Sequence, residues 1–181
     1  MDAKEISDWS DRYDEIYNEK LRKTEERIHE TINEQQYLSR DELVEIVQWK
    51  LEGMPGRRGG NVDRVKTVPN EFVQRVTEAA LLIDDPVTQL KTLKSIPGIG
   101  PATWTVVLAF YDPEHYGIGD RYILDEFFGE PRSIRATDYP KILEELRNRD
   151  PGKFNLRTVQ KAYYQKYRVE KEVGDFSKDS R

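Results

Sequence analysis

Residues 93–110, LKSIPGIGPATWTVVLAF, contain the pattern that decides the fold. Leu93 and Ile96 are spaced as on the buried side of a helix end, and the turn Pro-Gly-Ile-Gly follows them. Pro101 suits the first position of a second helix, because its missing N–H would have no partner within the helix there. The stretch therefore predicts two helices joined by a tight hairpin.

The turn of this hairpin has the features of a phosphate-binding site. Gly98 and Gly100 permit backbone conformations that a side chain would forbid, and they leave the main chain open to close approach. Ile99 can fill the gap between the two helices. The N–H groups of Ala102 and Thr103 would point outward at the positive end of a helix dipole, where anions bind. The alternative is a tight turn between two core helices, without a ligand.

Helical patterns also mark most of the remaining chain. The sequence SRDE at 39–42 has the serine and glutamate of a capping box, and Asp85 precedes a proline as an N-cap does. The glycine-rich stretch GMPGRRGGN (53–61) is predicted to be a loop, with Arg57 and Arg58 facing phosphate or solvent. No segment alternates with a period of two, so we expect an all-α fold. The predicted helices cover residues 4–34, 40–53, 69–83, 86–95, 101–110, 121–128, 139–149 and 156–173, while 112–120 is turn-rich and the tail 175–181 disordered.

The composition excludes several kinds of site. The chain has no cysteine, which excludes disulfides, zinc–cysteine sites and iron–sulfur clusters. Its two histidines, His29 and His115, lie in no recognisable metal-binding pattern. The N-terminus lacks the apolar stretch of a signal peptide, and no run of eighteen apolar residues occurs. We therefore expect a cytoplasmic protein, associated with the nucleoid if its source is prokaryotic, and no contact with a membrane.

The formal net charge of −5 is unevenly distributed along the chain. Residues 1–34 carry eleven acids and six bases, so the remainder is neutral overall. Residues 141–171 carry nine bases, Lys161 among them, against four acids. A basic surface for nucleic acid is therefore available near the C-terminus, although a solvated helical face explains the same residues.

The hairpin and the residues after it resemble the helix-hairpin-helix superfamily of DNA glycosylases, which includes endonuclease III-like and alkyladenine-type enzymes. Residues 96–100, IPGIG, match the hairpin of that family, and Asp120 stands twenty residues after Gly100, at the position of the family's catalytic aspartate. The resemblance implies a helix-hairpin-helix glycosylase-like fold of two closely packed helical lobes. In that division, residues 1–34 form a long amphipathic helix, 35–128 a barrel-like lobe, and 129–174 the helices that complete the second lobe.

The resemblance also implies roles for individual residues. Asp120 would be the catalytic carboxylate, with Asp112 and Asp125 as weaker candidates and a helix N-cap as the alternative role of Asp120. Members that cut the DNA strand through a Schiff base carry a lysine where this chain has Ala102. The implied enzyme is therefore monofunctional and uses water as its nucleophile. It needs no cofactor, has no iron–sulfur cluster and has room for a monovalent cation at the hairpin.

The remaining site residues follow from the need to hold DNA and a flipped-out base. The candidate aromatic residues of the base pocket are Trp49, Tyr111, Tyr116 and Tyr122, while Trp104 is expected in the core. The candidate DNA-binding residues are Pro97, Gly98, Ile99, Gly100, Ala102, Thr103, Arg121 and Lys161.

Two functions remain in competition. The first is a monomeric, monofunctional DNA glycosylase that excises a damaged or modified base from double-stranded DNA in base excision repair. The second is a non-catalytic DNA-binding or scaffold protein that keeps the hairpin without a competent pocket. The spacing from Gly100 to Asp120 favours the first, while the short chain between Ser39 and Phe110, in which a barrel helix is missing or very short, favours the second.

Overall fold

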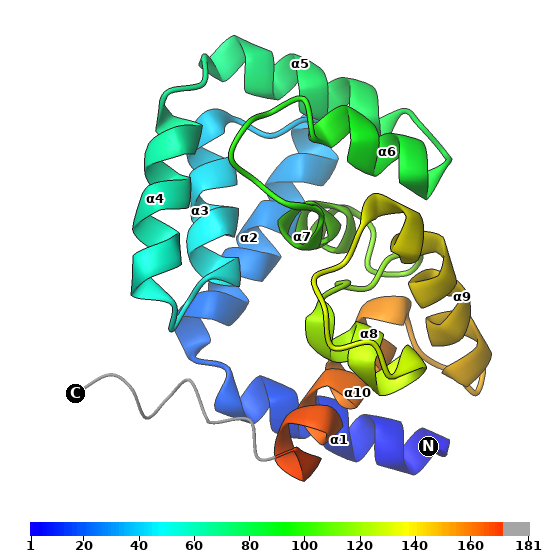
Figure 1. The fold of residues 1–181 in the computed structure, drawn as a ribbon. Helices are drawn as coiled ribbons and strands as arrows, with labels where there is room; N and C mark the ends of the chain where they lie inside the picture. Colours follow the sequence, from blue (N-terminus) through cyan, green and yellow to red (C-terminus); the bar gives the residue numbers. More distant parts are fainter. Residues whose placement is uncertain (172–181) are drawn as a thin grey trace.

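The structure is a computed structural model that describes residues 1–171 (Figure 1). These residues form ten α-helices and one 3-10 helix, without a strand, which confirms the predicted all-α fold. The elements are α1 (Ala3–Ile16), α2 (Glu19–Gln35), α3 (Arg40–Lys50), α4 (Pro55–Lys66), α5 (Asn70–Leu81), α6 (Pro86–Leu93), α7 (Pro101–Tyr111), α8 (Arg121–Phe128), η1 (Ala136–Asp138), α9 (Tyr139–Arg149) and α10 (Leu156–Glu170). The predicted end of the last helix at residue 173 and the tail 175–181 lie outside the described residues.

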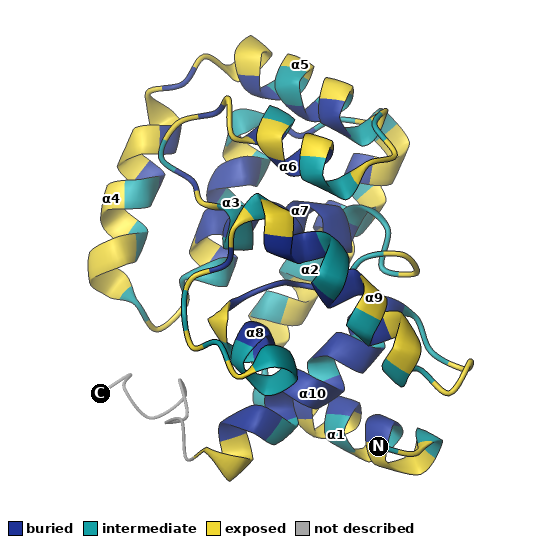
Figure 2. Cartoon of the chain, turned by 45° about the vertical axis from the view of Figure 1, so that its right-hand side comes forward, coloured by how far each residue is buried: buried dark blue, intermediate teal, exposed yellow. Residues whose placement is uncertain are grey.

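The helices pack in two groups. Helices α2 to α7 form the upper group in Figure 1, where α7 contacts α2, α3 and α6. The lower group joins the two ends of the described chain, because α1 packs along α10, which also contacts α8 and α9. Buried side chains run through both groups, while the outer faces of α4, α5 and α6 are exposed (Figure 2).

The prediction of one long helix over residues 4–34 is wrong. The helix ends at Ile16, and Asn18 caps a new helix by accepting hydrogen bonds from the N–H groups of Lys20 and Leu21 at 2.7 and 3.3 Å. Asparagine is among the best N-cap residues, so it supplies a local reason for the break. The break lets α1 pack on α10 while α2 packs on α7.

The prediction of a loop over residues 53–61 is also wrong, because this stretch forms most of α4. Its proline occupies the first turn of the helix, and Val62 and Val65 are buried, with α4 packed on α3. Gly59 and Gly60 lie on the exposed side, where an added Cβ would meet nothing within 4 Å. Packing of the valine face thus outweighs the low helix propensity of glycine. Five helices, α3 to α7, consequently occupy the segment between Ser39 and Phe110, where a barrel helix was predicted to be missing or very short.

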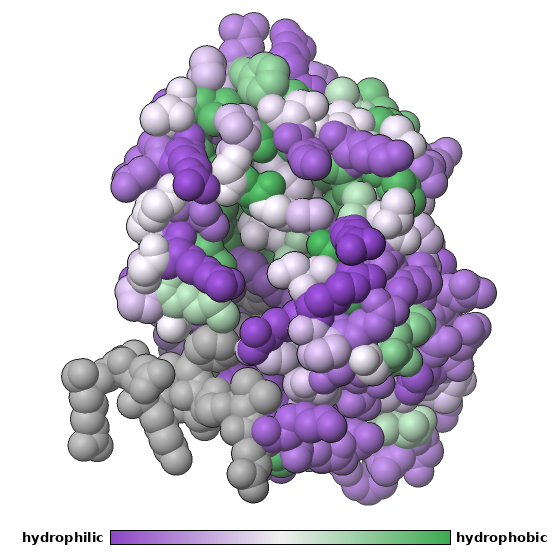
Figure 3. Space-filling view, in the orientation of Figure 1, coloured by the Kyte–Doolittle hydropathy of each residue, from purple (hydrophilic) through white to green (hydrophobic). Residues whose placement is uncertain are grey.

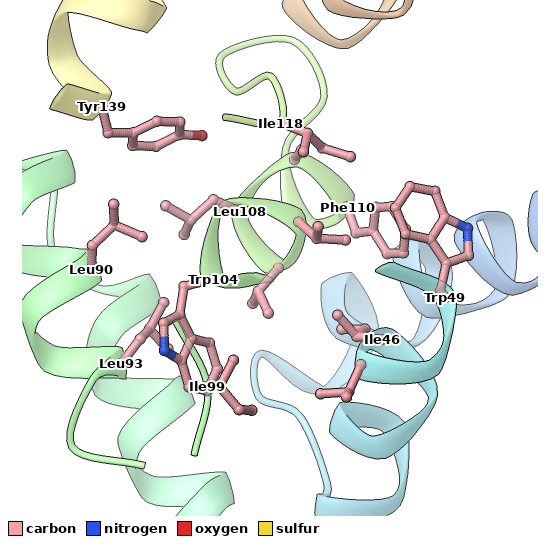
Figure 4. Packing of buried hydrophobic residues seen from close by; sticks show 14 of the residues in the cluster. Ile46, Trp49, Leu90, Leu93, Ile99, Trp104, Leu108, Phe110, Ile118 and Tyr139 are labelled. Carbon is pink, nitrogen blue, oxygen red and sulfur yellow. The ribbon is translucent and has the colours of Figure 1, made fainter. Parts of the chain in front are cut away.

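Helix α7 lies at the centre of the core (Figure 4). All of its residues from Thr103 to Phe110 are buried, as expected for a helix that is apolar on every side. At its start, Ile99 and Trp104 pack near Leu93 of α6, and at its end Phe110 meets the Trp49 ring edge-on at 4.9 Å (Figure 4). The hairpin is therefore anchored in the core on both sides of its turn, with Ile99 filling the gap as predicted.

Candidate functional site

The two glycines of the hairpin have different roles. Gly98 has a φ of +88°, and a Cβ there would lie 2.8 Å from the Cβ of Arg64, so only glycine fits. Gly100 has an ordinary φ of −94°, and a Cβ there would meet nothing within 4 Å. The prediction that both glycines serve an unusual backbone conformation is thus wrong for Gly100. Gly100 and Pro97 are instead exposed, so the main chain at this point is open to approach.

Within the described residues, the start of α7 leaves the backbone N–H of Ala102 without a partner. Pro101 occupies the first turn of the helix, as predicted. The N–H of Thr103 already donates to the carbonyl oxygen of Gly100 at 3.0 Å, in contrast to the prediction that it would be free. The N–H of Ala102 forms no hydrogen bond within residues 1–171. An anion approaching the positive end of the α7 dipole would therefore meet the N–H of Ala102 first.

A cavity of about 640 Å³ begins at this helix end. Its walls come from the end of α1, the junction of α3 and α4, the starts of α7 and α8, and α10, so it lies between the two helix groups of Figure 1. Its volume falls within the range of roughly 300–1,000 Å³ that small-molecule sites occupy. In the part of the chain that the structure describes, the charged residues of its walls are Lys50, Arg57, Arg121, Arg157 and Arg168 against Glu52 and Asp120. Bases therefore outnumber acids here, although the whole chain is acidic.

Asp120 lies on the wall of this cavity and caps α8. Its Oδ1 accepts hydrogen bonds from the N–H groups of Tyr122 and Ile123 at 2.9 and 3.1 Å, which fixes the orientation of the carboxylate. Its Oδ2 accepts a hydrogen bond from Nζ of Lys50 at 3.0 Å. The side chains of Asp120 and Lys50 are only 9% and 17% exposed. Asp120 is therefore the N-cap of α8, as one of the two alternatives predicted, and its side chain also lines the cavity.

Lys50 is a site residue that the sequence analysis missed. It is the last residue of α3 and lies 70 positions before Asp120 in the chain. Nothing in the local sequence distinguishes it from a lysine that ends a helix by favourable interaction with the dipole. Only the packing of α3 on α7, whose end at Tyr111 is followed by the loop to Asp120, brings the two charges together.

Aromatic rings form much of the remaining wall. Tyr13 and Tyr17 stack at 4.1 Å, and Tyr17 lies 5.9 Å from Trp49. From the C-terminal half of the chain, the ring of Tyr122 meets the ring of Tyr164 edge-on, with 5.7 Å between their centroids. All five residues line the cavity. The sequence predicted Trp49 and Tyr122 as pocket residues, but it missed Tyr13 of α1, Tyr17 directly after α1, and Tyr164 of α10.

Two of the predicted pocket residues lie elsewhere. Tyr111 directs its hydroxyl to Gln36, and Tyr116 donates to Gln89 at 3.1 Å and stacks on Tyr139. Neither lines the cavity that contains Asp120, so the structure does not bring these two predicted pocket residues together with that carboxylate. Trp104 is fully buried, in agreement with its expected place in the core.

The weaker candidates for the carboxylate also lie outside the cavity. Asp112 accepts hydrogen bonds from the N–H groups of Glu114 and His115 in a turn, at 3.1 and 3.2 Å. Asp125 accepts one from the hydroxyl of Tyr167 at 2.6 Å. Both carboxylates thus have partners outside the cavity, and among residues 1–171 Asp120 is the one aspartate that lines it.

The predicted basic surface near the C-terminus is largely neutralised. Lys161 pairs with Asp14 at 2.8 Å and lines a separate hollow beside Glu25 and Glu26, so its assignment to the DNA surface has no support in its surroundings. Arg157 is buried, and it pairs with Glu25. Arg121, in contrast, is exposed at the cavity and lies over the ring of Tyr122 at 4.7 Å. Arg121 thus places accessible positive charge at the cavity, while Arg157 and Lys161 of α10 are paired with acids.

No protein-family model, curated protein or solved structure compared with this chain matches it. Within residues 1–171, no three histidine or acidic side chains are grouped closely enough to hold a metal ion. None of the described helices combines the length and the apolar character that a membrane span requires. Inference about function consequently rests on the cavity itself.

Proposed function

We propose that this protein is a DNA glycosylase of the helix-hairpin-helix type, which breaks the N-glycosidic bond of a damaged or modified base. The observation that carries the proposal is the position of Asp120. Its carboxylate is oriented by two backbone N–H groups and lies on the wall of a cavity of about 640 Å³ whose rim includes the hairpin residues Gly100 and Ala102.

The chemistry of base removal suits such a carboxylate. When the bond between sugar and base breaks, positive charge develops on the sugar ring, as in the hydrolysis of glycosides. A fixed negative charge close to that ring stabilises the transition state more than the ground state. The hydrogen bonds from the N–H groups of Tyr122 and Ile123 hold the Asp120 carboxylate in place before the substrate arrives.

The walls of the cavity suit a base that has been turned out of the double helix. Enzymes that act on a base must extract it from the stack and hold it between aromatic or apolar side chains. Tyr17, Trp49 and Tyr122 offer such surfaces from two sides of the cavity. A base inserted among them would bring its sugar to the rim, near the start of α7.

The charge distribution suits the DNA backbone. The N–H of Ala102 and the exposed Arg57 and Arg121 lie at the cavity, where phosphates would flank a turned-out nucleotide. Figure 3 shows mainly hydrophilic side chains on the face seen in Figure 1, with apolar residues in small separate areas. Such a surface favours a charged partner over a broad apolar one.

The competing function is that of a non-catalytic DNA-binding or scaffold protein. The observation that favours it is that both carboxylate oxygens of Asp120 already have partners, two N–H groups on one and Lys50 on the other. In that case the pair would serve only to hold α3 against α8.

The test is a screen of the purified protein against duplexes that carry one lesion each. Suitable lesions are uracil, an alkylated purine, 8-oxoguanine and a mismatch, and the product is the free base together with an abasic site. We expect excision of at least one of these bases. Tight binding of every duplex with no base released would establish the scaffold function instead.

A further inference from the structure

The contact between Lys50 and Asp120 places a primary amine inside the proposed active site. Nζ of Lys50 lies 3.0 Å from Oδ2 of Asp120, and both residues line the cavity together with Ala102. Among residues 1–171, Lys50 is the one lysine of that wall. The expectation of a monofunctional enzyme was based on Ala102 alone, and α3 supplies the amine that α7 lacks.

We infer that Lys50 forms a Schiff base with the C1′ carbon of an abasic sugar and that the protein thereby cuts the DNA strand. This inference rests on the proposed function, because the abasic sugar is the product of base removal at the same site. It adds a catalytic residue and a second activity, that of an abasic-site lyase.

The position of Asp120 supports this role for Lys50. The nucleophile must be a neutral amine, so the ammonium group has to give up a proton before it attacks. Oδ2 of Asp120 is within hydrogen-bond distance to accept that proton. Oδ1 is held by the N–H groups at the start of α8, so accepting the proton does not require the carboxylate to turn.

The reaction balances without any further reagent. The neutral amine adds to the C1′ aldehyde of the open sugar, and the proton held by Asp120 goes to the departing hydroxyl, so that one water leaves as the iminium forms. Loss of the C2′ proton to Asp120 then expels the 3′ phosphate, which takes this proton from Asp120 as it leaves, with a double bond left between C2′ and C3′. Water finally hydrolyses the iminium, which returns the Lys50 ammonium and releases an unsaturated aldehyde on the cut strand.

An exposed surface lysine would not meet these conditions equally well. Lys66, at the end of α4, is exposed and does not line the cavity. Lys161 is held by Asp14 in a separate hollow. Of these lysines, Lys50 alone combines low exposure, a carboxylate partner and a place on the cavity wall.

The experiment uses the full chain and a duplex that contains one chemically prepared abasic site. Borohydride reduces the iminium to a stable cross-link, which is counted on a denaturing gel and located by mass spectrometry of the digested protein. We expect a cross-link on the peptide that carries Lys50, together with strand cleavage when borohydride is omitted. In Lys50→Arg, both should fall to the level of a sample without protein, since arginine keeps the charge beside Asp120 but forms no Schiff base.

Two further variants make the result specific. Lys66→Arg should cross-link like the wild type. The double variant Lys50→Arg with Ala102→Lys should regain cross-linking, because it restores an amine to the same cavity from α7. An unchanged melting temperature of Lys50→Arg would show that its loss of cross-linking does not come from unfolding.

The outcomes separate this inference from the proposed function. A cross-link that persists in Lys50→Arg, or that maps to another residue, overturns the role of Lys50. Release of a base without any cross-link or cleavage retains the glycosylase and rejects the lyase. Cross-linking through Lys50 with no base released from any lesion retains the lyase and rejects the glycosylase.

Discussion

The guanidinium of Arg157 donates hydrogen bonds to both carboxylate oxygens of Glu25, at 2.8 and 2.9 Å. One of its nitrogens also donates to the hydroxyl of Tyr13 at 3.1 Å. Arg157 is only 3% exposed, so this one side chain fixes α10 to both α1 and α2 behind the cavity. Burial by itself would raise the pKa of Glu25, but the charge and hydrogen bonds of Arg157 outweigh it, and the pKa lies below its usual value.

Removal of Glu25 should therefore destabilise the fold strongly. In Glu25→Ala the Arg157 charge stays buried without its carboxylate, which typically costs about 3–5 kcal/mol. The measurement is urea unfolding followed by circular dichroism. The matched control is Glu19→Ala, which breaks the exposed pair between Glu19 and Lys23 and should cost less than about 1 kcal/mol. Equal losses in the two variants would mean that the Arg157 cluster does not hold the helices together.

The ion pair between Arg132 and Asp138 predicts how the stability of the fold depends on pH. Hydrogen bonds from Arg132, aided by one from the N–H of Arg135 and opposed by burial, lower the pKa of Asp138 from 3.8 to about 2. Since the pKa is lower in the folded state, ionised Asp138 stabilises the fold above pH 3.8, and this contribution is lost as the pH falls toward 2.

Asp138→Asn should accordingly be less stable than the wild type at neutral pH, and its stability should fall less between pH 4 and pH 2. The measurement is the free energy of unfolding at a series of pH values. Asp11→Asn, at an exposed position, should run parallel to the wild type. If the free energy of unfolding of Asp138→Asn fell with pH as steeply as that of the wild type, other carboxylates would be responsible for the acid sensitivity.

The two glycines of the hairpin allow DNA contact to be separated from folding. Gly100→Val adds a side chain in open space, so the fold should persist while binding to all duplexes weakens to the same extent, because a backbone contact to phosphate does not read sequence. Gly98→Val should instead unfold the hairpin, since its φ is +88° and Arg64 is in the way. Gly60→Val, on the exposed side of α4, is the control for added bulk. Fluorescence anisotropy and thermal melting distinguish the two effects, and unchanged affinity in Gly100→Val would remove the hairpin from the DNA interface.

The sequence predicted what depends on neighbouring residues and missed what depends on packing. The hairpin, Pro101 at its helix start and the N-cap role of Asp120 all follow from short-range rules, and the structure shows them. The glycines of α4 predicted a loop. The stretch is helical because its buried valine face packs on α3, and this contact cannot be seen in the local sequence. The partnership of Lys50 with Asp120 likewise needs the folded arrangement of helices that are distant in the chain.

The aromatic wall provides a test of base insertion. Tyr122 lines the cavity and Tyr111 does not, although both are half-buried. Stacking of a base on an aromatic ring is worth about 1–3 kcal/mol by alanine substitution, so Tyr122→Ala should weaken excision by roughly 5- to 150-fold. Tyr111→Ala should affect excision much less. Single-turnover rates on one lesion duplex, corrected for any change in melting temperature, give the comparison, and equal effects of the two variants would argue against a base between these rings.

The decisive variant for base removal is Asp120→Asn. An amide of nearly the same shape keeps an oxygen that can accept the N–H groups of Tyr122 and Ile123, and asparagine caps helices as well as aspartate does, so α8 should form normally. DNA affinity should be kept or slightly increased, because a negative charge near the phosphates is removed. Excision should fall by roughly 10²-fold or more, because a neutral amide neither stabilises the positive charge on the sugar nor accepts a proton.

Asp125→Asn is the matched control for Asp120→Asn. Asp125 lies on the same short helix, but its carboxylate contacts Tyr167 and is outside the cavity. Its replacement should leave both DNA binding and excision nearly unchanged. Full excision by Asp120→Asn, or its loss in Asp125→Asn alone, would show that the catalytic carboxylate lies elsewhere. The cavity between the two helix groups would then lack a catalytic carboxylate. Its basic residues and the hairpin at its rim would have to bind another ligand.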